Sequence, residues 1–216
     1  MASVKFCGLT RARDAELAVE LGADYVGVIL ASGPRLLDTG RAREVLAAVP
    51  GHVKRVGVFG SQELGRIAAQ VESIELDVVQ LHTARGRDEI EKLRSLRAVE
   101  LWAVMRVADG VLPIDYEDLA ACADAVVIDS LVHGALGGTG VATDWPALAA
   151  SLEARGRPRR LVLAGGLRPG NVARAMRILR PDIVDVSSGV EVSPGVKDPR
   201  LMRAFARSVL STDITT

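Results

Sequence analysis

Short apolar runs alternate with amphipathic stretches along the whole chain. The first run, residues 4–7, is followed by Gly8 and a polar turn, after which apolar residues recur three and four apart at Leu17, Ala18 and Leu21. Short runs rich in Val are typical of strands buried in a parallel sheet, and the three-to-four spacing is typical of a helix. The chain therefore opens with a strand followed by a helix.

The same strand–helix pair repeats eight times, and no Pro- or Ser-rich linker separates the pairs. The predicted strands are residues 4–7, 25–30, 55–59, 77–81, 100–105, 125–128, 160–164 and 183–186. The predicted helices are residues 13–21, 40–49, 62–71, 88–96, 116–121, 145–154, 172–179 and 199–209. Eight near-equal units favour one α/β domain, a single (β/α)8 TIM barrel over residues 1–210 with a frayed tail at 211–216. A doubly wound sheet is the alternative.

Composition narrows the class of protein. Lys and Arg together number 27, as do Asp and Glu, so the net charge is zero and a broad nucleic-acid or acidic-membrane surface is not expected. No apolar run approaches the length of a membrane span. With only Cys7 and Cys122, the chain lacks the cysteines of a disulfide framework or a metal site. We expect a cytoplasmic protein that binds no membrane.

Polar side chains follow several predicted strands, where ligands bind in parallel α/β folds. Cys7 ends the first strand and is either a base or nucleophile or a small buried core residue. Asp129 ends the sixth strand and either faces the barrel mouth or caps a loop. Arg35 has a fork suited to a carboxylate or phosphate, although alone it is more simply a solvated arginine. His82, after the fourth strand, either contacts a ligand or is structural. The sequence contains no cluster of His, Asp and Glu residues that would indicate a metal site.

Three consecutive glycine loops follow the last three strands: residues 137–140, 164–166 and 187–189. Glycines let backbone N–H groups approach an anion, and barrels commonly bind phosphate in the loops after strands seven and eight. Tight turns also use glycine, but three such loops in succession indicate a phosphorylated ligand. The residues alone thus predict a small-molecule sugar-phosphate site with a thiol and a carboxyl group as a base–acid pair.

Over nearly its full length the sequence resembles the phosphoribosylanthranilate isomerase family of tryptophan biosynthesis. The motifs that carry the resemblance are residues 5–10 (KFCGLT), 56–59 (VGVF), 79–82 (VQLH), 137–140 (GGTG), 163–167 (LAGGL), 185–191 (DVSSGVE) and 194–198 (PGVKD). The resemblance implies an Amadori rearrangement that needs no cofactor, and a monomer or homodimer.

The resemblance also implies roles for individual residues. Asp129 is the general acid that opens the furanose ring, and Cys7 is the general base that removes the C2 proton. Arg35 binds the anthranilate carboxylate. From its place after the fourth strand, we also expect His82 to contact the substrate. The phosphate-binding residues are Gly165, Gly166, Ser188 and Gly189. We expect a bell-shaped pH dependence that rises as the thiol ionises and falls as the acid loses its proton.

The sequence departs from the family pattern at Gly33, at Thr83, at Ala103 and at residues 141–143, all expected near the mouth. These departures leave Cys7 and Asp129 intact and bear on substrate affinity or identity. Two rival interpretations exist. A related Amadori isomerase of histidine biosynthesis would have aspartate in place of Cys7, and a non-catalytic phosphosugar-binding barrel would have lost the acid and the base.

Overall fold

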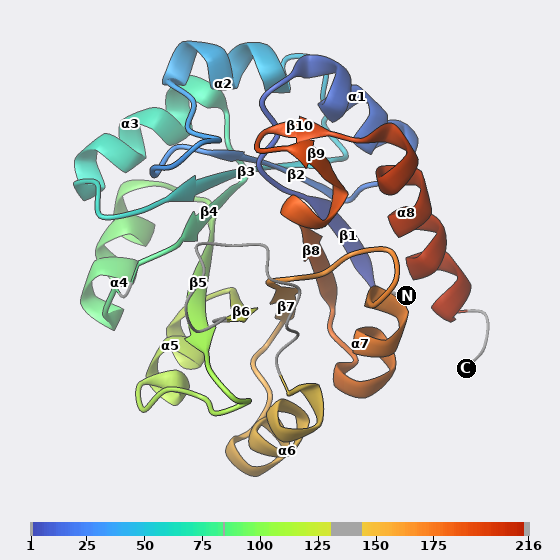
Figure 1. Cartoon of the computed structure of the whole chain (residues 1–216). Coiled ribbons are helices and arrows are strands. Elements are labelled where there is room, and N and C mark those ends of the chain that lie inside the picture. The colour runs from blue at the N-terminus through green and yellow to red at the C-terminus, as the bar shows by residue number, and fades with distance from the viewer. Residues whose placement is uncertain (1, 84, 131–143, 214–216) are drawn as a thin grey trace.

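The computed structural model describes residues 2–83, 85–130 and 144–213, and its eight main strands form one closed parallel barrel (Figure 1). Neighbouring strands follow the chain order, and β1 pairs with β8 to close the barrel. The strands are β1 (Ser3–Phe6), β2 (Tyr25–Ile29), β3 (Lys54–Phe59), β4 (Val78–Leu81), β5 (Glu100–Val107), β6 (Ala125–Ser130), β7 (Leu161–Ala164) and β8 (Ile183–Val186). The predicted (β/α)8 TIM barrel is confirmed.

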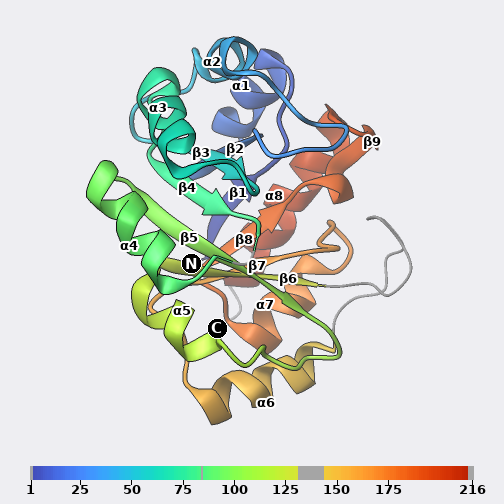
Figure 2. The ribbon, with the colours of Figure 1, turned by 90° about the vertical axis from the view of Figure 1, so that its left-hand side faces the viewer.

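Eight helices surround the barrel and cover the outer face of its strands (Figures 1 and 2). They are α1 (Ala12–Glu20), α2 (Thr39–Leu46), α3 (Leu64–Ile74), α4 (Arg87–Leu96), α5 (Tyr116–Cys122), α6 (Trp145–Arg155), α7 (Val172–Leu179) and α8 (Pro199–Asp213). The residue that follows α1 explains where that helix ends. Gly22 follows α1 with φ of 80°, the left-handed conformation that glycine adopts readily beyond a helix.

The core has two layers because successive side chains of a strand point to opposite faces. One apolar cluster fills the space between strands and helices. A second, smaller cluster fills the barrel interior: Tyr25, Val56, Val78, Trp102, Val104, Ala125, Val127, Val162, Ala164 and Ile183. The two aromatic rings among them, Tyr25 and Trp102, pack edge to face with centroids 5.0 Å apart. The interior is therefore solid beneath the mouth.

Two strands extend past their predicted ends. β5 continues to Val107 and β6 to Ser130, because the backbone ladder between them goes on through the pairs Arg106–Asp129 and Val107–Ser130. Asp129 accordingly lies inside a strand rather than after it. Strands pair through backbone hydrogen bonds, so a strand can continue through a polar residue. The hydrophobic pattern, in contrast, predicts that the strand ends at such a residue.

The hydrophobic pattern missed a small antiparallel hairpin between β8 and α8. After the 3₁₀ turn Ser188–Val190, β9 (Glu191–Ser193) pairs with β10 (Val196–Lys197) around a turn at Gly195, whose φ is 80°. Strands of three and two residues are too short for periodicity to reveal. The hairpin lies on the mouth side of the barrel, near β1, β2 and α8 (Figure 1).

Two further outcomes concern the C-terminal third of the chain, and a third concerns all the described helices. Asn171 is the N-cap residue of α7, yet its side chain accepts from the Arg168 backbone N–H and donates to the Gly166 carbonyl, thereby fixing the preceding turn. α8 runs to Asp213, beyond the predicted end at residue 209, and the proposed division at residue 210 stays a prediction. None of the helices in the described ranges is long and apolar enough to cross a membrane.

Candidate active site

The strand alternation brings the chemical groups to one layer at the barrel mouth. On four strands, a residue whose side chain lies in the barrel interior is followed two positions later by a polar residue or cysteine at the mouth. These pairs are Lys5 and Cys7 on the β1 side, Gln80 and His82 on the β4 side, Val127 and Asp129 on β6, and Asp185 and Ser187 on the β8 side. The structure thus brings Cys7, His82 and Asp129 to the mouth together, as predicted from their strand ends.

Cys7 is almost completely buried, with 6% of its surface exposed. Its Sγ packs against Gly27 of β2 so closely that a Cβ built on Gly27 would lie 3.0 Å from the sulfur. Burial raises the pKa of the thiol above its ordinary value of 9.0, and Asp185 raises it further, whereas Lys5 and Lys197 lower it. The thiol thus starts protonated, beside cations that favour its ionisation.

One layer below Cys7, three polar side chains form a buried network. The Lys5 Nζ donates to Asp185 Oδ2 at 2.6 Å and to Gln80 Oε1 at 2.8 Å. Lys5 and Asp185 are register partners on β1 and β8, which places their charges side by side. Burial alone disfavours the ammonium, but the nearby Asp185 and Cys7 outweigh it and raise the pKa of Lys5. A stable cation therefore lies beneath the thiol.

Asp129 has far fewer partners. Its side chain is 28% exposed, and its Oδ2 lies 3.7 Å from His82 Nε2, beyond hydrogen-bond range. Burial raises the pKa of Asp129 above its ordinary 3.8, and burial likewise lowers the pKa of His82. Both shifts favour the neutral forms, so the site favours a neutral carboxyl group beside a neutral imidazole. A carboxyl group that keeps its proton is suited to act as an acid.

Arg35, expected to bind a carboxylate, already holds one. Its Nε lies 2.9 Å from Glu191 Oε1, and its Nη2 lies 2.6 Å from Glu191 Oε2. Glu191 also accepts from Lys197 Nζ at 2.8 Å. Burial alone would raise the pKa of Glu191, but the hydrogen bonds from these two cations outweigh it and keep the pKa below its ordinary value. Glu191 is therefore an anion.

The glycine loops differ in how far the structure describes them. Residues 137–140, one of the three predicted phosphate loops, and departures 141–143 lie outside the described residues. Gly165 and Gly166 follow β7 with φ of 78° and 64°, conformations that favour glycine. A Cβ on Gly189 would lie 1.8 Å from the Leu167 carbonyl oxygen, so the loop after β8 packs directly on the loop after β7. Ser188 begins the 3₁₀ turn at this contact.

One residue that the sequence places near the mouth, Ala103, does not lie there. Ala103 is buried in the layer between strands and helices, since Trp102 and Val104 on either side of it face the barrel interior. The expectation that Ala103 lies near the mouth is wrong, because it assigned a strand position without regard to alternation. Thr83 does lie at the mouth, lining a pocket of about 320 Å³ with His82 and Arg106.

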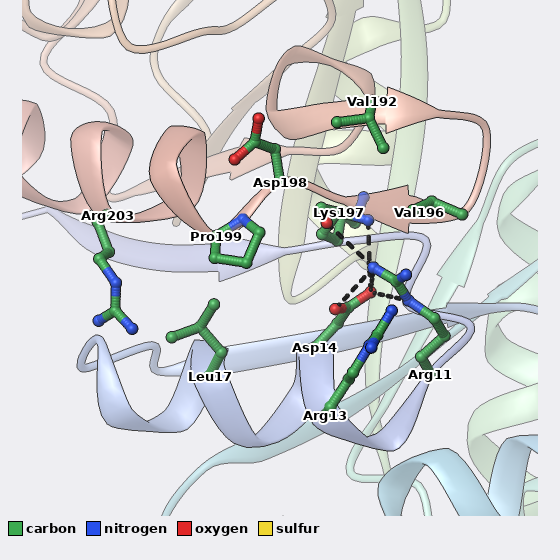
Figure 3. Close-up of a pocket in the computed structure, with 10 residues that line it drawn as sticks. All are labelled: Arg11, Arg13, Asp14, Leu17, Val192, Val196, Lys197, Asp198, Pro199 and Arg203. Atoms are coloured by element: carbon green, nitrogen blue, oxygen red, sulfur yellow. Dashed lines mark hydrogen bonds and ion pairs between the residues drawn. The ribbon is translucent and has the colours of Figure 1, made fainter.

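A second pocket, of about 550 Å³, lies outside the mouth between α1, the β9–β10 hairpin and α8 (Figure 3). Its walls carry Arg11, Asp14 and Lys197, whose interactions tie the hairpin to the loop after β1. None of the predicted site residues lines it. Within the part of the chain that the structure describes, no three metal-ligating side chains cluster.

The hydrophobic pattern alone missed several charged residues at the site. Lys5 and Asp185 interrupt apolar runs, and both are buried, as is Lys197 at the end of the short β10. A charged residue inside a strand that is otherwise apolar is costly unless paired, so such interruptions were an available signal. Arg106, whose charge acts on both His82 and Asp129, lies in the part of β5 that the pattern left out.

A thiol and a carboxyl group facing one barrel mouth, with glycine loops after the last two strands, define a (β/α)8-barrel enzyme of the acid–base class. Residues 4–208 match the family model described as N-(5'phosphoribosyl)anthranilate (PRA) isomerase. The chain belongs to this family.

Known relatives match this chain over nearly its whole length. The N-(5'-phosphoribosyl)anthranilate isomerase of Acidithiobacillus ferrooxidans is 40% identical over 98% of this chain and 99% of its own. The crystal structure of the Thermotoga maritima enzyme has a TM-score of 0.86 at 31% identity, covering 98% of this chain and 100% of that chain. A further isomerase structure, in complex with reduced 1-(o-carboxyphenylamino)-1-deoxyribulose 5-phosphate, has a TM-score of 0.82 at 31% identity with the same coverage.

Proposed function

We propose that this chain catalyses the Amadori rearrangement of N-(5-phosphoribosyl)anthranilate to 1-(2-carboxyphenylamino)-1-deoxyribulose 5-phosphate, in tryptophan biosynthesis. Asp129 is the general acid and Cys7 the general base. The observation that carries this assignment is the presence, at the same mouth, of a carboxyl group on β6 whose pKa burial raises and of a cation-backed thiol after β1.

The first step is ring opening. Asp129 donates its proton to the furanose ring oxygen, the bond from that oxygen to C1 breaks, and the anthranilate nitrogen supplies the electron pair that forms an iminium at C1. Burial favours the carboxyl proton that this step consumes. A well-placed general acid typically contributes about 10²–10⁴-fold to rate.

The second step is proton removal at C2. The Cys7 thiolate takes this proton, the C2–H electron pair forms the C1–C2 double bond, and the iminium becomes a neutral enolamine. Tautomerisation moves the C2 hydroxyl proton to C1 and leaves the ketone. Release of the proton from Cys7 to solvent and reprotonation of Asp129 restore the enzyme. Protons alone are exchanged, so the net reaction is an isomerisation.

Substrate contacts follow from the same layout. Arg35 binds the anthranilate carboxylate, and the loops containing Gly165, Gly166, Ser188 and Gly189 bind the phosphate. His82 lies beside the acid and faces the ribose. Supporting this arrangement, the β7 and β8 loops pack against each other at one side of the mouth.

An assay with freshly generated N-(5-phosphoribosyl)anthranilate tests the proposal, using the wild type, Cys7→Ser and Asp129→Asn. We expect turnover by the wild type and a loss of roughly 10²–10⁴-fold in kcat for each variant, with the fold retained. A wild type that converts no substrate refutes the function. A Cys7→Ser variant at full rate refutes the role of Cys7 as base.

Two further expectations accompany the function. We expect a monomer or homodimer, which analytical ultracentrifugation distinguishes, and a cytoplasmic location, which fractionation of the source cells checks. No nucleic-acid partner is expected, because the net charge is zero.

A further inference from the structure

Glu191 holds only one of the two hydrogen-bonding edges of Arg35. The bonds run from Nε and Nη2, at 2.9 and 2.6 Å, which is the side-on edge of the guanidinium. A guanidinium carries five N–H groups, and its Nη1–Nη2 edge can bind a second carboxylate. Among the described residues, no hydrogen bond or ion pair uses Arg35 Nη1. The end-on edge is therefore available to a ligand.

The Arg35 side chain lies beside the proposed base. A Cβ on Gly8 would lie 2.6 Å from Arg35 Cδ and 2.8 Å from Ser187 Oγ, so the arginine stem passes over the residue that follows Cys7. Arg35 and Cys7 are close enough for their charges to interact. A carboxylate on the open edge would therefore be bound next to the thiol.

The carboxylate of Glu191 is itself held firmly. Its side chain is 4% exposed, and Lys197, which is fully buried, donates to it at 2.8 Å. The same Lys197 Nζ donates to the Cys7 carbonyl at 2.6 Å and to the Ser187 carbonyl at 3.1 Å. One ammonium thus connects the carboxylate that holds Arg35 with the backbone at the ends of β1 and β8.

The hairpin that carries Glu191 and Lys197 is fixed to the loop after β1. Arg11 Nη2 donates to the Lys197 carbonyl at 3.0 Å, and Thr10 Oγ1 donates to the Gly195 carbonyl at 2.5 Å (Figure 3 shows the Arg11 contact). Arg11 is in turn paired with the buried Asp14. Glu191 therefore acts from a rigid support rather than from a free loop.

The charges in this cluster do not balance. Arg35 and Lys197 are two cations against the single anion Glu191, and the remaining buried pair, Lys5 with Asp185, is neutral overall. This cluster therefore carries one positive charge beside Cys7 when Lys197, whose pKa burial lowers, is protonated and the thiol is neutral. An anionic substituent on the aryl group matches this charge, and a neutral aryl group does not.

We propose that Glu191 is a positioning residue that gives the enzyme its preference for a substrate with an aryl carboxylate. It holds Arg35 by the side-on edge, so that the end-on edge faces the substrate. This inference rests on the proposed function and assigns to Glu191 the specificity of that site.

The test compares two substrates, N-(5-phosphoribosyl)anthranilate and N-(5-phosphoribosyl)aniline, which lacks only the carboxylate. For Glu191→Gln we expect KM for the anthranilate substrate to rise about 10- to 100-fold, with kcat within about twofold of wild type. We expect kcat/KM for the aniline substrate to change by less than about threefold. The preference for the carboxylate thus falls without loss of chemistry, a split that a merely structural role would not produce.

Three variants complete the experiment. Arg35→Ala should remove the preference altogether. Glu44→Gln makes the same change in an exposed pair with Arg41 and should change kcat and KM for neither substrate. Glu191→Asp keeps the charge on a shorter side chain and should recover part of the preference, and it carries the test if Glu191→Gln does not fold.

The outcomes separate the two proposals. A wild type inactive on both substrates refutes the proposed function. A wild type that prefers the anthranilate substrate, combined with a Glu191→Gln variant that keeps this preference or loses both substrates equally, refutes the role of Glu191 alone.

Discussion

The two sides of the barrel mouth are built in opposite ways. Around Cys7, buried ions and hydrogen bonds connect β1, β8 and the hairpin: Lys5, Asp185, Lys197, Glu191 and Arg35. Around Asp129, the ion pair with His82 spans 3.7 Å, and the carboxyl group is partly exposed. The difference matches the chemistry, because a buried thiol needs cations to ionise, whereas a carboxyl group keeps its proton best when cations are few.

The largest expected difference between the sides is in stability. Lys5→Met should lower the free energy of unfolding by about 3–5 kcal/mol, because it leaves Asp185 charged and unpaired in the barrel interior. Urea unfolding followed by circular dichroism measures this loss.

The matched control is Lys54→Met, which removes the same charge from an exposed pair with Asp77 at 3.4 Å. This change should cost about 0–1 kcal/mol. Equal losses in the two variants would mean that the network beneath Cys7 does not stabilise the barrel more than a surface pair does.

The next largest expected difference between the two sides is in the pH dependence of the rate. The active form needs a thiolate and a protonated carboxyl group, but burial raises both pKa values from ordinary values as distant as 9.0 and 3.8. Asp129 therefore loses its proton at lower pH than Cys7. The product of the two required fractions then rises up to the pKa of Asp129, levels off, and falls above the pKa of Cys7.

The two limbs are thus assigned the opposite way from the expectation based on sequence, in which the thiol gave the rising limb. Alkylation of Cys7 by iodoacetamide as a function of pH, in a Cys122→Ser background, measures the thiol pKa directly. It should coincide with the falling limb of kcat/KM. Coincidence with the rising limb would restore the original order.

The smallest effect is expected on the acid side. His82→Asn should change the free energy of unfolding by less than about 0.5 kcal/mol, since the contact with Asp129 is long and partly exposed. Because His82 lowers the pKa of Asp129, its removal should move the rising limb slightly to higher pH. A large loss of stability would show that the acid side is as tightly connected as the base side.

The eight strand–helix units, and hence the barrel, could be predicted because each strand is a short apolar run bounded by polar residues. Cys7, His82 and Asp129 could be placed at the mouth because parallel strands end on one side. The β9–β10 hairpin could not be predicted, since strands of two and three residues carry no periodicity. Ala103 was misplaced because a strand position has meaning only together with its alternation.

By itself, the amino-acid sequence determined the order of elements, the face on which the thiol and the carboxyl group lie, and the family. Only the tertiary structure decided which charges meet. Lys5 and Asp185 are 180 residues apart, and Arg35 and Glu191 are 156 apart, so each pair forms only when β1 closes on β8. Closure of the barrel brings these ions together, and burial makes their pairing necessary. The chemical character of Cys7 therefore depends on contacts that no local pattern encodes.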